Sequence, residues 1–145
     1  MRPNDWQSLP VVGDDETVLR RIHPNHYNYD RKLVTRACLR EPDYAQNSTS
    51  YGASVFVRSK LANGVADLEK ADPTWIGAGV ASVPVASLTN QTLGVSVRET
   101  PIDCDKPTIA HAHASLVNVS TVNRDEIVAL FQQHLTRIPT PRPPR

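Results

Sequence analysis

Two histidines, His111 and His113, lie in the stretch 109–119 and form the densest group of side chains that could do chemistry. The alternation along this stretch predicts a β-strand, with both imidazoles on one face and their Cα atoms roughly 6.6 Å apart. Histidine changes charge near neutral pH, so such a pair can act as general acid and general base. The pair can equally line a pocket or simply cap a strand.

Cys104 and two aspartates, Asp103 and Asp105, precede these histidines and are side chains that zinc accepts as ligands. Their spacing matches no known zinc motif, and the chain has no Cys-x-x-Cys pair. The sequence also lacks a Gly-rich phosphate loop, a Gly-x-Ser-x-Gly elbow and a His-Glu-x-x-His motif. We therefore predict neither a metal ion nor a cofactor.

The loop 23–30 contains a second pair of histidines, His23 and His26, with two tyrosines and an aspartate. If the strand that carries His111 lies near the first strand, both pairs can share one cleft. Arg20 and Arg21 would then anchor an anionic substrate. This arrangement predicts a His-dependent hydrolase that uses His26, His111 and His113 for acid–base chemistry.

An arginine on the first predicted strand, a Ser-Thr-Ser segment (residues 48–50) and Glu99 follow one another along the chain. This order resembles the arginine-specific ADP-ribosyltransferases at scattered points, although Glu99 is one carboxylate where that family has Glu-x-Glu. The resemblance implies an NAD-using transferase. In it, Arg20 and Ser50 would position the dinucleotide and Glu99 would activate the acceptor.

The bulk properties exclude several classes of protein. A chain of 145 residues has the usual length of a single domain. No apolar run approaches the roughly 20 residues of a membrane span, and a net charge of +1 gives no global attraction to nucleic acid. The two cysteines, in a chain whose start does not resemble a secretion signal, are typical of reduced thiols. We expect a cytoplasmic protein that does not associate with membranes and whose main partner is not nucleic acid.

Patterns of apolar residues predict the elements that position these side chains. Strands are expected at 17–22, 53–57, 75–83, 92–98 and 109–119, a helical turn at 85–88, and helices at 60–71 and 124–138. Ser59 would cap the first helix, and Asn123 with Glu126 the second. An apolar face on the second helix is formed by Ile127, Leu130, Phe131, Leu135 and Ile138.

We therefore expect one small α+β domain over residues 17–138. Its sheet would be mixed or mostly antiparallel with about five strands, and the helices, the C-terminal amphipathic helix among them, would pack on one face. Residues 1–16 would form a loosely ordered arm, and 139–145 a proline- and arginine-rich tail.

The expected function is that of an interaction or accessory module that binds a protein partner. The loop 23–30 and the tail would form its contact surface, through Tyr27, Tyr29, Arg142 and Arg145. The alternative is a small enzyme of one of the two kinds described above. Its catalytic residues would be Arg20, His26, Ser50, Glu99, His111 and His113.

Overall fold

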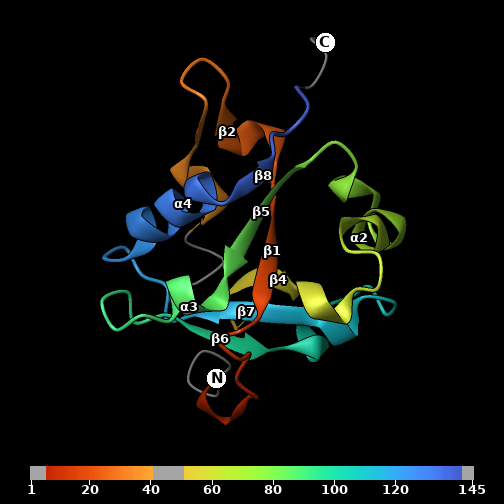
Figure 1. The fold of residues 1–145 in the computed structure, drawn as a ribbon, viewed down its shortest axis with the longest axis vertical. Coiled ribbons are helices and arrows are strands. Elements are labelled where there is room, and N and C mark those ends of the chain that lie inside the picture. Colours follow the sequence, from red (N-terminus) through yellow and green to blue (C-terminus); the bar gives the residue numbers. More distant parts are fainter. Residues whose placement is uncertain (1–5, 41–50, 142–145) are drawn as a thin grey trace.

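The fold is built on a six-stranded antiparallel sheet in the computed structural model, which describes residues 6–40 and 51–141. The strand order is β6-β7-β4-β1-β5-β8, and a separate hairpin pairs β2 with β3 (Figure 1). The predicted α+β fold is confirmed, with one strand more than expected. The strands are β1 (Thr17–Ile22), β2 (Tyr27–Asn28), β3 (Leu33–Val34), β4 (Ala53–Val57), β5 (Gly79–Pro84), β6 (Ser96–Glu99), β7 (His113–Val117) and β8 (Leu135–Arg137).

Helices cover both faces of the main sheet. Helix α4 (Arg124–Gln133) and the turn α3 (Val85–Leu88) bury their apolar side chains against one face, as predicted for the C-terminal helix. Phe131 of α4 is fully buried there, which contributes about 1.5–3 kcal/mol. Helix α2 (Val65–Ala71) lies on the opposite face with Leu19, so the expectation that all helices share one face is wrong.

Two elements begin later than predicted because glycines adopt positive φ angles. Helix α2 begins at Val65, after Gly64 with a φ of 60°. Ser59 does not cap this helix. It lies in a 3-10 turn that precedes the helix, and its hydroxyl donates to the Glu16 carboxylate. Strand β6 likewise begins after Gly94, whose φ is 69°. A positive φ is costly for residues with a Cβ and interrupts regular structure.

The stretch predicted as a single strand from 109 to 119 is divided. Residues Ala110–Ala112 form a 3-10 turn, closed by a hydrogen bond from Ala112 N to Ile109 O, and β7 begins at His113. His111 therefore lies in the turn and is exposed, whereas His113 is 3% exposed. The prediction that both imidazoles share one strand face is wrong.

The predicted C-terminal helix also ends early. Helix α4 stops at Gln133, and the following residues form β8 on the open edge of β5, with Leu135 opposite Ala81. The edge of β5 has unpaired backbone N–H and C=O groups, which an added strand can bond and a helix cannot, because the backbone groups of a helix bond within the helix. At the other end of α4 the Asn123 side chain makes no capping bond and donates to Leu93 O and Asn118 O instead.

Both flanks of the domain contact its body in their described parts. Val12 is buried and its N–H donates to Val97 O at 2.9 Å, beside β6. The Arg98 guanidinium lies 5.1 Å from the centre of the Trp6 ring. At the C-terminal side, Thr140 N donates to Gly77 O. Within the described residues, no helix combines the length and apolar character that crossing a membrane requires.

Candidate functional site: a cleft where two central strands separate

A cleft lies where β1 and β4 part in the middle of the sheet. The two strands pair at Leu19 and Phe56, and beyond this point they have no register with each other. Strand β1 continues along β5 to Ile22, and β4 continues along β7 to Ala53. The gap has a volume of about 270 Å³, close to the lower limit of roughly 300 Å³ for ligand pockets. Only a small ligand fits such a volume.

The Arg20 side chain bridges β1 and β4 across the gap. One terminal nitrogen of its guanidinium donates to the backbone oxygen of Ser54 at 2.7 Å, and the other donates to Cys38 O. The Arg20 side chain thus replaces the backbone hydrogen bonds that β1 and β4 would make if they stayed paired. Hydrogen bonds of charged groups are stronger than those of neutral groups, so this bridge holds the separated strands in place.

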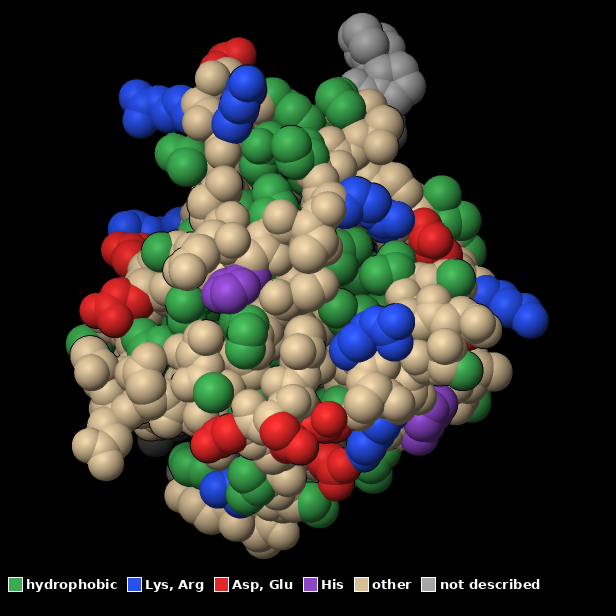
Figure 2. Space-filling view, viewed as in Figure 1, with side chains coloured by type: hydrophobic (Ala, Val, Ile, Leu, Met, Phe, Trp, Pro, Cys, Tyr) green, Lys and Arg blue, Asp and Glu red, His purple; other side chains and the backbone are tan. Residues whose placement is uncertain are grey.

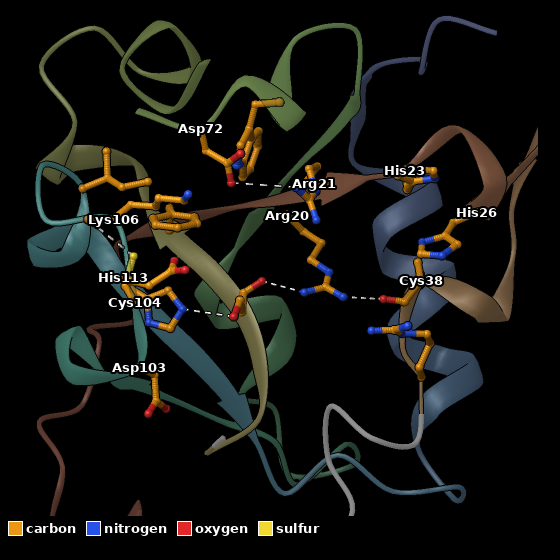
Figure 3. A pocket seen from close by; sticks show the side chains of 16 residues that line it. Arg20, Arg21, His23, His26, Cys38, Asp72, Asp103, Cys104, Lys106 and His113 are labelled. Carbon is orange, nitrogen blue, oxygen red and sulfur yellow. Dashed lines mark hydrogen bonds and ion pairs between the residues drawn. The ribbon is translucent and has the colours of Figure 1, made fainter. Parts of the chain in front are cut away.

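One end of the cleft is cationic. His26 and His23 come from the loop after β1, and Figure 3 shows them on the same side of the cleft as Cys38, with Arg20 and Arg21 between them and the other wall. Burial lowers the pKa of His26, and the charges of His23, Arg20, Arg40 and Arg21 lower it further. This end of the cleft therefore has a positive potential.

The other end mixes acidic and basic groups. Burial raises the pKa of Asp72, but hydrogen bonds from Thr74 and the charges of Arg21 and Lys106 outweigh it, so the net shift is downward. Burial raises the pKa of Cys104, which keeps its thiol protonated and unreactive. The cleft as a whole is lined by Arg20, Arg21, His23, His26, Cys38, Arg40, Ser54, Phe56, Asp72, Trp75, Asp103, Cys104, Asp105, Lys106, Ile109 and His113.

His113 lies in the wall that β4 and β7 form. Its Nδ1 is 2.7 Å from the backbone oxygen of Thr100, and its Nε2 is 3.0 Å from the Ser54 Oγ. Burial lowers the pKa of His113, although the bond to Thr100 and the charge of Asp103 act in the opposite direction. The ring packs edge-on against Phe56, with centroids 5.3 Å apart. Its orientation is therefore fixed from several sides.

The predicted catalytic residues fall into separate places. Arg20, His26 and His113 all line the cleft. His111 and Glu99 lie elsewhere, where the His111 ring bonds to Lys60 O at 2.8 Å and the Glu99 carboxylate pairs with the Lys60 amine. Ser50 lies outside the described residues. The ADP-ribosyltransferase pattern is not assembled by the described residues, because Glu99 does not line the cleft that contains Arg20.

The predicted partner-binding residues occupy different surroundings. Tyr27 is only 6% exposed and packs in the core, with its ring 5.0 Å from that of Tyr29. The Tyr29 hydroxyl donates to Pro139 O at 2.8 Å, which ties the loop to the start of the tail. Arg142 and Arg145 lie outside the described residues. Where the structure is described, it brings no three potential metal ligands together.

The sequence reasoning missed Ser54 and several charged residues of the cleft. Ser54 is the exposed position in a strand of otherwise buried residues, and it is the single polar residue of Ala53–Val57. A solvent-facing serine on a strand is common, however, and only the neighbouring strand supplies the histidine. Asp72 and Lys106 belong to loops whose approach to β1 has no local sequence signal.

One face of the molecule has a mixed charge. Figure 2 shows one face, on which Lys and Arg side chains are spread over several elements and alternate with Asp and Glu. This face has no continuous basic surface of the kind that follows a nucleic-acid backbone.

Comparison with known proteins gives no relative from which a function could be transferred. No protein-family model, no curated protein and no solved structure matches this chain.

Proposed function

We propose that the protein binds a small molecule carrying a carboxylate or phosphate group, and that it does so in the cleft between β1 and β4. One observation carries the proposal: three arginines from two separate segments, Arg20, Arg21 and Arg40, line the cleft, and their positive charges act on His26 at one end of it. Arg20 and Arg21 come from β1, where Arg21 also forms an ion pair with Asp72 at 3.9 Å, and Arg40 comes from beyond β3. Arginine binds such anions through several directed N–H groups.

The polarity of the cleft supports the same ligand class. Lys106 and three aspartates line the end away from His26, so a ligand with an anionic group and hydrogen-bonding groups behind it would find partners along the whole cleft. The small volume favours a compact acid or phosphate ester over a dinucleotide. The protein-partner function expected from the sequence stays a prediction, and it does not depend on this cleft.

The test is a titration with sulfate, which is tetrahedral like phosphate and keeps its charge between pH 5 and 8. The imidazole resonances of His26 are followed by NMR at several pH values. Bound sulfate should raise the pKa of His26, because it neutralises the cations that now lower it. By linkage, sulfate should bind more tightly as His26 becomes protonated at lower pH.

A matched pair of variants makes the titration specific. Arg21→Gln should weaken sulfate binding about tenfold, since charged hydrogen bonds are typically worth 1.5–3 kcal/mol. Arg36→Gln is the control, because the Arg36 side chain pairs with Asp125 on the exposed surface and does not line the cleft. Unchanged His26 resonances, or equal weakening by both variants, would overturn the proposal.

A further inference from the structure

Ser54 and His113 face each other across the β4–β7 ladder on the cleft side of the sheet. In the register of this ladder Phe56 lies opposite His113, and Ser54 opposite Ser115. The Ser54 hydroxyl is therefore diagonal to His113 and comes within 3.0 Å of its Nε2. Both residues line the cleft, and Ser54 is exposed to it. A serine hydroxyl that contacts an imidazole in an open cleft is the basic unit of nucleophilic acyl transfer.

The hydrogen bonds of His113 determine which ring nitrogen carries the proton. Nδ1 lies 2.7 Å from the carbonyl oxygen of Thr100, which can only accept. In the neutral ring Nδ1 must then be the N–H donor, so Nε2 has a free lone pair that accepts from the Ser54 hydroxyl. Because burial lowers its pKa, the imidazole stays neutral near pH 7. The base is thus in the required tautomer before any substrate arrives.

Thr100 orients the histidine ring through Nδ1, which is the role of the acidic residue in the common Ser-His-Asp arrangement. It is fully buried, and its hydroxyl contacts both His113 Nδ1 at 2.9 Å and Ser115 Oγ at 2.8 Å. A buried backbone carbonyl orients the ring as a carboxylate would, but without a negative charge. The arrangement therefore has the three parts that activate a nucleophile: serine, base and a group that orients the base.

We propose that Ser54 is the nucleophile and His113 the general base of an ester hydrolase whose substrate carries an anionic group beside the ester. The choice of substrate rests on the anion-binding function proposed above, whereas the Ser54–His113 pair stands on its own geometry. The Arg20 guanidinium contacts the backbone oxygen of Ser54 at 2.7 Å. The cationic end of the cleft thus begins directly beside the nucleophile.

The reaction has two steps. Ser54 Oγ bonds to the ester carbonyl carbon while its proton passes to His113 Nε2, and this proton then goes to the leaving alkoxide as the ester C–O bond breaks. In the second step, water gives a proton to His113 Nε2 and its oxygen attacks the acyl carbon. The bond to Ser54 Oγ breaks, the serine recovers its proton from His113, and the acid is released. Ester and water give acid and alcohol, and the protein returns unchanged.

Hydrolysis of mono-4-nitrophenyl succinate, an activated ester with a free carboxylate, tests the assignment. The full chain should release 4-nitrophenolate from it with a higher kcat/KM than from neutral 4-nitrophenyl acetate. Ser54→Ala should lower kcat/KM for the succinate ester by at least about 100-fold, because without the nucleophile the general base His113 has no serine to activate, and general-base activation alone contributes at least about that factor. Ser59→Ala is the matched control, because Ser59 is an exposed serine that contacts Glu16 and does not line the cleft.

A fluorophosphonate reagent gives a second readout, since it labels only activated serines. Peptide mapping by mass spectrometry should find the label on Ser54, and His113→Gln should prevent it. The assignment is overturned if Ser54→Ala hydrolyses the ester like the unmodified protein. It is equally overturned if the unmodified protein neither hydrolyses the ester above the buffer rate nor takes up the label on Ser54.

The sulfate titration separates this assignment from the proposed binding function. Ser54→Ala should still bind sulfate and shift the His26 resonances, because it leaves the cationic end of the cleft in place. Sulfate binding without ester hydrolysis or labelling refutes the nucleophile and keeps the anion site. Labelling of Ser54 without sulfate binding refutes the anion site and keeps the nucleophile.

Discussion

The two halves of strand β1 differ in what lies on their β4 side. The first half pairs with β4, with Val18 opposite Val57 and Leu19 opposite Phe56, and the side chains of Val18 and Leu19 are buried. The second half leaves β4, and the Arg20 side chain spans the gap. Because β5 pairs with β1 along its whole length, β1 keeps one complete ladder throughout. A central strand can therefore open a polar cleft on one side and remain part of the sheet on the other.

The comparison predicts that the paired half stabilises the domain through buried side chains. Leu19 is 2% exposed and packs with Phe56, Trp75 and Val80. Leu19→Ala should lower the free energy of unfolding by about 2–5 kcal/mol, because it leaves a cavity in a packed cluster. Urea denaturation measures this loss. The control Leu33→Ala removes a leucine that is 45% exposed and should have a small effect. Equal losses in both variants would show that burial in this cluster is not the reason why Leu19 stabilises the protein.

The bridge across the separated half should have the next largest effect. Arg20→Gln removes two charged hydrogen bonds to backbone oxygens and should cost about 1.5–3 kcal/mol of unfolding free energy. Arg36→Gln breaks an exposed pair with Asp125 and should cost less than about 1 kcal/mol. Thermal and urea unfolding of the two variants give the ranking. If Arg20→Gln were as mild as Arg36→Gln, the guanidinium would not hold the separated strands.

The buried histidine of the cleft wall should make stability depend on pH. The fold lowers the pKa of His113, so as the pH falls below about 6.5 the unfolded chain gains a proton before the folded chain does. Its contribution is complete above that pH and decreases below it, by at most about 1.4 kcal/mol per pH unit. Burial and neighbouring cations lower the pKa of His26 too, which adds to the decrease.

Urea unfolding at pH 7.5 and pH 5.5 checks this dependence. The difference between the two pH values should shrink in His113→Gln, whatever the absolute stability of that variant. Replacement of His111 is the control, since its ring lies in the exposed 3-10 turn and outside the cleft. An undiminished difference in His113→Gln would show that the protons are taken up elsewhere.

Local patterns in the sequence predicted much of the fold. Strand β1 has the predicted bounds, 17–22, and the helical turn lies at 85–88 as predicted. Helix α4 packs on the sheet through Ile127 and Phe131, as its apolar spacing predicted. These features depend on residues a few positions apart, so the local spacing of apolar residues is enough to predict them.

Features that depend on distant partners were not predictable in this way. Strand β8 was taken for the end of a helix, because its three residues form a strand only beside the open edge of β5. The position of His113 was expected on a longer strand shared with His111, and the turn at Ala110–Ala112 separates them. In each case a tertiary contact outweighed a local preference, which is worth only a fraction of a kcal/mol per residue.

The sequence by itself determined that this chain forms one α+β domain, and it supplied arginines and histidines around the first strand. It could not show that β1 and β4 separate after Leu19, since strand pairing involves residues more than thirty positions apart. Nor could it show that Ser54 would meet His113. Only the tertiary structure decided which of these side chains share a cleft. The physical reason is that the sequence gives the type of each side chain, whereas the distance between side chains far apart in the sequence depends on how the strands pair.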